Sequence, residues 1–126
     1  MKLTLAYWFL FVAFFLPFVA AGIAKAGRRD YDNADPRGWE ARLDGRRRRA
    51  VAAMNNTFEG LPFFAAAVIV AHQLGAAQGR LDALAAVWLG LRVAYLFLYV
   101  GDRASARSLV WIAALAVNAW IFLLGA

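Results

Sequence analysis

The sequence predicts an all-α integral membrane protein, built as an up-down bundle of four transmembrane helices. The 126-residue chain is 63% hydrophobic and only 17% charged, whereas charged residues make up about a quarter of a soluble domain. Its apolar residues fall in four long runs, and most of its basic residues fall in the segment after the first run. A chain of this length forms a single domain, here residues 1–126.

Four apolar runs give the expected spans, at about residues 3–24, 47–74, 81–101 and 104–125. A helix needs about 20 apolar residues to cross a hydrocarbon core roughly 30 Å thick. Backbone groups in lipid must satisfy one another, so such runs become helices. The connector at residues 79–81 is so short that neighbouring spans must be antiparallel.

The first run also has the features of a signal peptide. It follows Lys2, and the Ala-Lys-Ala sequence at 24–26 matches a small-x-small cleavage site. We favour a retained span, because the uncharged run exceeds a usual signal-peptide core, is rich in aromatic residues and is followed at once by basic residues. Pro17 predicts a kink within this helix, which neighbouring helices can tolerate.

The distribution of arginine and lysine predicts the orientation. Residues 25–49 carry nine basic and five acidic residues, and Arg103 and Arg107 precede the last run, whereas the other side has only Lys2 and Arg80. Basic connectors stay in the cytoplasm, so we expect the loop at 25–46 there and both termini on the opposite side. We expect a bacterial inner (plasma) membrane, because no organelle-retention signal is visible.

Composition excludes several classes of site. The chain has no cysteine and one histidine, His72, so it has no disulfide, no cysteine nucleophile and no thiolate metal site. A zinc site and a Ser-His-Asp triad are also disfavoured. The net charge of +6 comes largely from one segment, which suits anionic membrane lipids better than nucleic acid. We therefore expect neither a metal nor a nucleic-acid partner.

Three polar residues fall at the same predicted depth in three spans. Glu59, Arg92 and Asn118 lie ten or eleven residues from the cytoplasmic ends of their helices, about 15 Å deep at 1.5 Å per residue. Ionisable groups at this depth are costly and mark functional sites. An Arg92–Glu59 ion pair, within one subunit or across an interface, would bury both charges. The alternative is that this layer only fixes helix register.

Helical phase places further polar residues in two stripes. In the second span, Arg49, Asn56 and Glu59 are seven and three residues apart. In the third, an arginine and two tyrosines recur at i, i+3 and i+7, and another arginine continues the line: Arg92, Tyr95, Tyr99 and Arg103. Together the stripes predict a polar groove with a cationic mouth, suited to an anionic and partly apolar ligand. Packing of the tyrosines, with their hydroxyls at the interface, is the alternative.

The pattern RAxxAxxNxxExxPxF at residues 49–64 is specific, because it fixes several residue types at set spacings. It resembles the signature of the MAPEG family, the membrane-associated proteins in eicosanoid and glutathione metabolism, which include microsomal glutathione transferases. Arg92, Tyr95, Tyr99 and Arg107 are similar to the family's arginines and tyrosines of the third and fourth helices. Where eukaryotic members carry an arginine four residues before the motif asparagine, this chain has Ala52.

The resemblance implies a homotrimer that binds glutathione between adjacent subunits, open toward the cytoplasm. It implies that Asn56, Glu59, Tyr95 and Tyr99 hold glutathione, that Arg107 stabilises its thiolate and that Arg92 belongs to the polar layer. Glutathione would supply the sulfur nucleophile that this chain lacks, and a neighbouring guanidinium favours the thiolate. The two carboxylates of glutathione need further guanidinium partners, for which Arg48, Arg49 and Arg103 are available.

Three functions follow as hypotheses. The first is a glutathione transferase, with or without peroxidase activity, that acts on lipophilic small molecules arriving through the bilayer. The second is a non-catalytic trimeric scaffold or ligand-binding protein of the same fold. The third is a small transporter or channel subunit whose Glu59–Arg92 layer lines a path.

Overall fold

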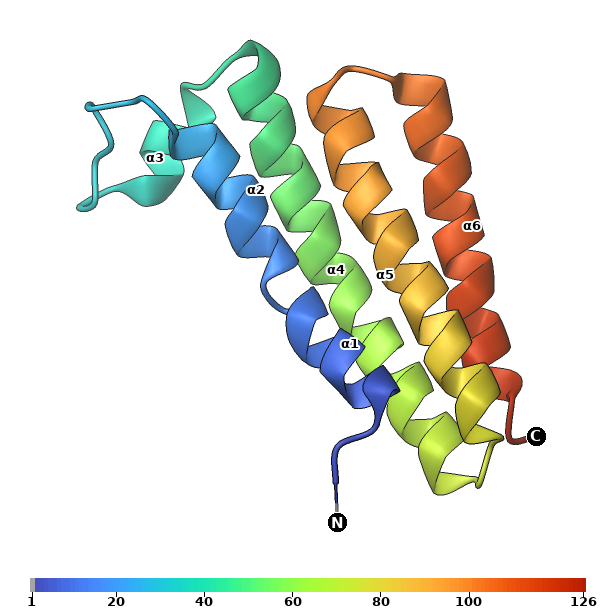
Figure 1. The fold of residues 1–126 in the computed structure, drawn as a ribbon. Helices are drawn as coiled ribbons and strands as arrows, with labels where there is room; N and C mark the ends of the chain where they lie inside the picture. Colours follow the sequence, from blue (N-terminus) through green and yellow to red (C-terminus); the bar gives the residue numbers. More distant parts are fainter. Residues whose placement is uncertain (1) are drawn as a thin grey trace.

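The computed structural model describes residues 2–126, which form six helices and no strand. These are α1 (Leu5–Ala13), α2 (Leu16–Lys25), α3 (Pro36–Ala41), α4 (Gly45–Gln73), α5 (Gln78–Val100) and α6 (Ala104–Leu123). The all-α prediction is thus confirmed for the described chain. In Figure 1, α1 and α2 follow one another along one side, α4, α5 and α6 run beside them, and α3 lies at one end.

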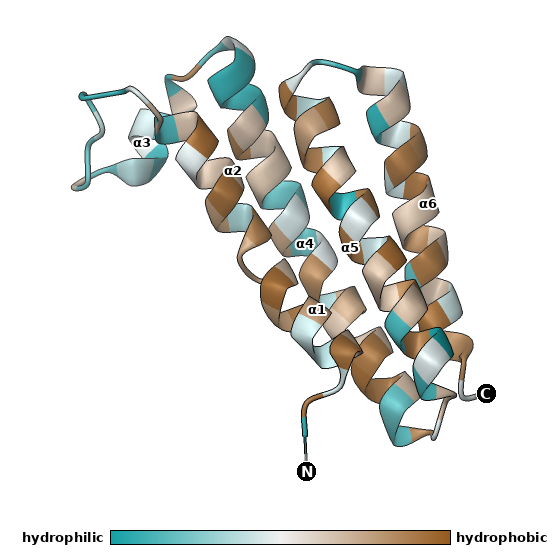
Figure 2. Ribbon diagram, in the orientation of Figure 1, coloured by the Kyte–Doolittle hydropathy of each residue, from teal (hydrophilic) through white to brown (hydrophobic). Residues whose placement is uncertain are grey.

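Three segments are long and apolar enough to cross a membrane. They are Leu5–Lys25, Gln78–Val100 and Ala104–Leu123. The 29-residue α4 is long enough as well, but arginines, asparagines and a glutamate in its first half lower its hydropathy. Figure 2 shows the polar colours on this end of α4 and in the loop around α3, and apolar colours along most of α1, α2 and α6. Large apolar side chains such as Phe18 and Trp120 are exposed on these helices, as expected for contact with lipid.

The first predicted span is two helices that meet at Phe14 and Phe15. Pro17 lies in the first turn of α2, where its missing N–H breaks no intrahelical hydrogen bond. The interruption of the helix at Phe14 and Phe15, just before Pro17, confirms the predicted kink. At the start of α1, Thr4 caps the helix by accepting a hydrogen bond from the Tyr7 backbone N–H at 3.3 Å.

A short helix, α3, lies within the connection that the sequence predicted to be a cytoplasmic loop at 25–46. In α3, Asp35 Oδ1 accepts a hydrogen bond from Gly38 N at 3.0 Å, and Pro36 occupies the first turn. An aspartate N-cap followed by proline favours helix initiation as well as a turn. The helix forms because Trp39 is buried and packs edge-on against the Tyr31 ring, at 5.0 Å between ring centroids.

The start of this connection is held by a bidentate ion pair. Arg28 Nε and Nη2 donate to the two carboxylate oxygens of Asp30, at 2.8 and 2.6 Å. These hydrogen bonds hold the pKa of Asp30 well below its usual range and raise the pKa of Arg28. The Arg28 guanidinium also lies 5.8 Å from the centre of the Trp39 ring, so the pair links the end of α2 to α3.

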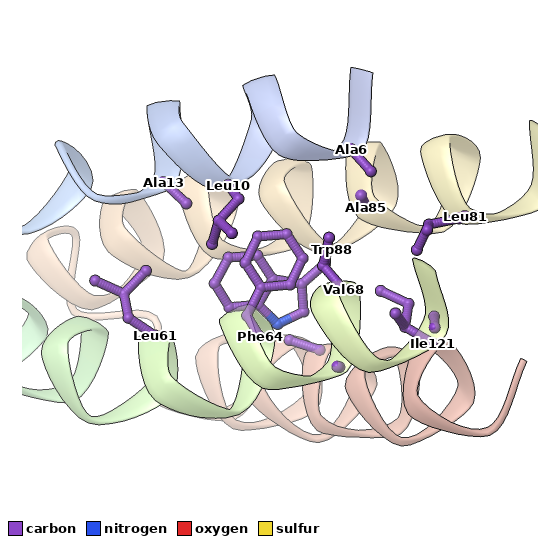
Figure 3. Close-up of a cluster of buried hydrophobic side chains, with 13 residues drawn as sticks. Ala6, Leu10, Ala13, Leu61, Phe64, Val68, Leu81, Ala85, Trp88 and Ile121 are labelled. Carbon is purple, nitrogen blue, oxygen red and sulfur yellow. The ribbon is translucent and has the colours of Figure 1, made fainter. Parts of the chain in front are cut away.

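The apolar core is centred on two stacked aromatic rings. Phe64 of α4 and Trp88 of α5 lie 3.7 Å apart at an interplanar angle of 9°, and both are buried. Figure 3 shows Leu10 of α1 close to these rings and Ile121 of α6 in the same cluster. The other buried residues of this cluster include many alanines, which let helix backbones approach closely within a membrane.

Candidate functional site

A groove of about 530 Å³ opens between α4, α5 and α6, at the end of the bundle nearer the basic loop. Five of the seven residues that the sequence singled out for catalysis or ligand binding line this groove: Asn56, Glu59, Tyr95, Tyr99 and Arg107. Its volume falls in the range of about 300–1,000 Å³ that is usual for small-molecule sites. The structure therefore brings together residues from three helices that lie up to 51 positions apart in the chain.

A row of four stacked side chains, with two tyrosines between two arginines, runs along one side of the groove. The Arg107 guanidinium lies 4.3 Å from the centre of the Tyr99 ring. Tyr99 meets Tyr95 edge-on at 5.7 Å and 84°, and the Arg92 guanidinium lies 4.2 Å from the centre of the Tyr95 ring. Such cation–π contacts favour a fixed guanidinium orientation. The two tyrosines thus connect a buried arginine to one at the groove mouth.

The outer end of this stack comes from α6 rather than from α5. The sequence stripe continued from Tyr99 to Arg103, but α5 ends at Val100. Asp102 then adopts a left-handed conformation with φ of 60°, and the chain reverses. Arg107, in the first turn of α6, takes the position over the Tyr99 ring.

Arg92 is bound by neutral partners. It is 3% exposed, and its Nη2 donates to Asn56 Oδ1 at 2.8 Å and to Thr57 Oγ1 at 3.3 Å. The Thr57 hydroxyl in turn donates to the Ala53 carbonyl at 2.7 Å. A buried guanidinium is thereby fixed between α4 and α5 by an amide and a hydroxyl.

The Arg92–Glu59 ion pair does not form within one chain. Among residues 2–126 the ion pairs are Arg28–Asp30 and Arg37–Glu40. Glu59 is exposed and lines the groove instead, and Asn56 and Thr57 are the hydrogen-bond partners of Arg92 Nη2. The carboxylate is therefore available to a positively charged group of a ligand.

Arg49 and Arg103 lie outside the groove lining. Arg49 Nε donates to the Val100 carbonyl at 3.2 Å, one of the orphan acceptors at the end of α5. Arg103 is the N-cap residue of α6. Their assignment to ligand binding stays a prediction of the sequence pattern.

Arg48 and Asn55 occupy positions that the two sequence stripes do not include. A hollow of about 500 Å³ adjoins the groove and shares Ala52 and Asn55 with it, and Arg48 lines this hollow. Arg48, Ala52 and Asn55 are spaced four and three residues apart, which is the helical-face spacing. A third stripe in α4 was therefore readable from the sequence.

Ser108 and Trp111 complete the groove on the α6 side. Trp111 follows Arg107 by one helical turn, so the same phase rule locates it. The wall next to Arg107 thus offers a hydroxyl and a large aromatic surface.

Comparison with known proteins assigns the family. The model of the MAPEG family matches residues 5–126. The chain belongs to the MAPEG family. No curated protein and no solved structure matches it. Membership in this membrane family and the three membrane-capable helices together make the chain a membrane protein.

The family includes glutathione transferases and members with other activities, so membership alone leaves the reaction open. What this MAPEG groove offers chemically is a guanidinium at Arg107, a free carboxylate at Glu59 and the amides of Asn55 and Asn56. Such a set suits a ligand with both an amino group and acidic groups.

Proposed function

We propose that this MAPEG chain is a membrane-bound transferase that binds glutathione in the groove and joins its thiol to lipophilic electrophiles. The observation that carries the proposal is the position of Arg107. Its guanidinium is fixed over Tyr99 on the same groove as the free carboxylate of Glu59 and the amide of Asn56. One cation, one anion and an amide thus surround the space that the tripeptide would fill.

Arg107 would act on the sulfur. A free thiol is largely protonated at neutral pH, and a nearby guanidinium favours the thiolate, which is the nucleophile. The thiolate then forms a carbon–sulfur bond with the electrophile. In an addition, the π bond of the electrophile breaks and its other carbon takes up a proton from solvent; in a substitution, the bond to the leaving group breaks and the leaving group departs with the electron pair. The thiol proton passes to solvent. Arginine suits this role because it stays charged beside an apolar phase.

The peptide ends need partners of opposite charge. Glu59 would accept the ammonium group, since its carboxylate has no cation partner among residues 2–126. Arg48, in the adjoining hollow, supports the placement of one glutathione carboxylate there. Arg49 and Arg103 would serve the second carboxylate only after a rotamer change, because they lie outside the lining.

The proposal includes a membrane arrangement. We infer that α4 is the fourth span, since it packs against α2, α5 and α6 and turns Asn56 and Thr57 toward Arg92 of α5. The four spans then form an up-down bundle with the basic loop and groove mouth in the cytoplasm, both termini opposite, in a bacterial inner membrane. A homotrimer with its grooves at the subunit boundaries completes the proposed assembly.

Glutathione titration of the detergent-solubilised full chain tests the proposal. We expect saturable binding heat and the ultraviolet absorbance of a thiolate, and we expect Arg107→Ala to remove the thiolate signal. Arg80→Ala, an exposed arginine at the other end of the molecule, is the matched control and should leave both signals intact. Absence of heat and thiolate at millimolar glutathione would contradict the proposal and favour a non-catalytic scaffold of the same fold.

A further inference from the structure

A second cavity of about 150 Å³ lies deeper in the bundle, between α4, α5 and α6. We call it the inner chamber and define it by Glu59, Phe63, Arg92, Leu115 and Asn118. Its polar wall holds the three residues that the sequence placed at one depth. Its apolar rim, at Phe63 and Leu115, is 38% and 43% exposed on the outer surface of the chain.

Two buried polar atoms at this chamber have no hydrogen-bond partner among residues 2–126. Arg92 is 3% exposed and Asn118 is 4% exposed, yet Arg92 Nε and Asn118 Oδ1 are both unpaired. Buried polar atoms are nearly always paired, so each exception requires an explanation. The Arg92 side chain cannot rotate to give Nε a partner without breaking the hydrogen bonds from its Nη2 to Asn56 and Thr57.

The two unpaired atoms are chemically complementary. Arg92 Nε–H is a donor, and Asn118 Oδ1 is an acceptor. A hydroxyl group can accept from the first and donate to the second, whereas a carbonyl or ether can only accept and an ammonium can only donate. The chamber is also lined by one cationic and one anionic side chain, Arg92 and Glu59, so a neutral ligand meets no unbalanced charge.

Size and surroundings narrow the ligand further. A volume of 150 Å³ holds about five groups the size of a water molecule, at roughly 30 Å³ each. That is enough for a hydroxyl and a few carbons, but not for a long chain. The rest of an apolar chain would extend past Phe63 and Leu115, whose side chains are partly exposed on the surface of one chain.

We propose that the inner chamber binds the hydroxyl group of a neutral lipophile that enters from the membrane. Its hydroxyl accepts from Arg92 Nε–H and donates to Asn118 Oδ1. The chamber and the groove share Asn56, Glu59 and Trp111, so a molecule held here lies next to the groove. That hydroxyl-bearing lipophiles are the preferred electrophiles rests on the proposed function, whereas the binding itself does not.

Binding of an alcohol to the full chain in lipid nanodiscs, without glutathione, tests the inference. Trp88 and Trp111 line the chamber, so 8-bromo-1-octanol should quench tryptophan fluorescence. We expect 1-octanol to displace this quencher at least fivefold more effectively than octyl methyl ether, which cannot donate a hydrogen bond. Equal displacement by the two compounds would mean that the chamber does not recognise a hydroxyl donor, and would overturn the inference.

Two variants keep the test independent of a folding defect. Asn118→Leu removes the acceptor and should abolish the preference for the alcohol, and Leu115→Trp should do so by filling the chamber. Gln73→Leu, which replaces an exposed amide in the last residue of α4, should leave the preference unchanged. Retention of the preference in both chamber variants would overturn the inference. Loss of glutathione binding with the alcohol preference intact would instead contradict the proposed function alone.

Discussion

The guanidinium of Arg107 lies 4.3 Å from the centre of the Tyr99 ring, on a neighbouring helix. This contact is worth about 0.5–1 kcal/mol at an exposed site and up to about 2 kcal/mol where water is excluded. Tyr99 is itself fixed by its edge contact with Tyr95. The orientation of the proposed thiolate-stabilising cation therefore depends on the face of one aromatic ring, and the chemistry of that ring can be varied.

Replacing Tyr99 separates the role of its ring from that of its hydroxyl. We expect Tyr99→Phe to retain most thiolate formation, because phenylalanine keeps the ring face that Arg107 contacts. We expect Tyr99→Leu to lower the thiolate yield at fixed glutathione several-fold, which corresponds to about 1 kcal/mol. Ultraviolet titration of both variants in detergent measures the effect.

Equal losses of thiolate in the two variants would contradict this interpretation. If Tyr99→Phe loses as much thiolate as Tyr99→Leu, the hydroxyl contacts the ligand and the ring is not the support. Tyr31→Leu, in the loop near α3 and outside the groove, controls for a general effect of removing a tyrosine.

Two neighbouring asparagines allow stability and binding to be told apart. Asn56 accepts from Arg92 at 2.8 Å, whereas the Asn55 side chain is exposed and has no hydrogen bond within residues 2–126. We expect Asn56→Ala to lower the free energy of unfolding by about 1–3 kcal/mol, because it leaves part of a buried guanidinium unpaired. We expect Asn55→Ala to change stability little, since surface substitutions usually stay within about 0.5 kcal/mol.

Thermal unfolding in detergent, monitored by far-ultraviolet circular dichroism, measures this difference. Both asparagines line the groove, so both variants should weaken glutathione binding. Equal stability of the two variants would show that the Arg92–Asn56 hydrogen bond contributes nothing to folding.

The third-helix stripe was predictable because it depends on helical phase alone. Arg92, Tyr95 and Tyr99 lie on one face, and the cation–π and edge contacts connect them in the predicted order. Positions that depend on where a helix ends were not predictable in this way. Arg103 falls beyond Val100 and the left-handed Asp102, so the phase of α5 no longer applies to it.

The second-helix stripe shows a different limit. Helical phase places Arg49 on the same face as Asn56 and Glu59. It does not show which hydrogen-bond acceptor, a ligand or a backbone carbonyl, the Arg49 side chain will bind. Arg49 is engaged by the Val100 carbonyl, one of the acceptors that every helix end leaves open. Likewise, charge and equal predicted depth indicated that Arg92 would pair with Glu59 within one chain or across an interface, whereas the neighbouring Asn56 provides the bond that forms within the chain.

The Arg28–Asp30 pair predicts a pH dependence of stability. The hydrogen bonds from Arg28 lower the pKa of Asp30 in the folded chain, relative to about 3.9 for an unperturbed aspartate. A lowered folded-state pKa gives stability that is present at neutral pH, shrinks as the pH falls below about 5 and disappears below the folded-state pKa. The effect is small because the pair is exposed and screened by salt.

Comparing the chain with Asp30→Asn tests this dependence. The melting temperature of the unmodified chain should be slightly higher at pH 7, and the difference should narrow at pH 3. Asp32→Asn is the control, because its amide oxygen can still accept the Ala34 N–H bond that Asp32 accepts at 2.9 Å and because Asp32 is in no ion pair within residues 2–126. A difference that stays constant with pH would refute the assignment.

The far end of the molecule depends on one carboxylate that joins α1 to α5. Asp82 Oδ1 accepts from the Ala6 backbone N–H at 2.8 Å and from Gln78 Nε2 at 2.7 Å. The Ala6 N–H is among the first donors of α1, which have no partner within the helix. We expect Asp82→Ala to lower the free energy of unfolding by about 1–3 kcal/mol, since a partly buried donor loses its acceptor.

Asp82→Asn should cost less than Asp82→Ala, because its amide oxygen can still accept the Ala6 N–H. Asp44→Ala is a matched control, since Asp44 is the N-cap residue of α4 but makes no side-chain capping hydrogen bond. Thermal unfolding of the three variants in one detergent ranks them. Equal losses for Asp82→Ala and Asp44→Ala would mean that the bond between α1 and α5 does not stabilise the bundle. A loss confined to Asp82→Ala would mean that the Asp82 carboxylate, through its bonds to Ala6 and Gln78, fixes the start of α1 against α5.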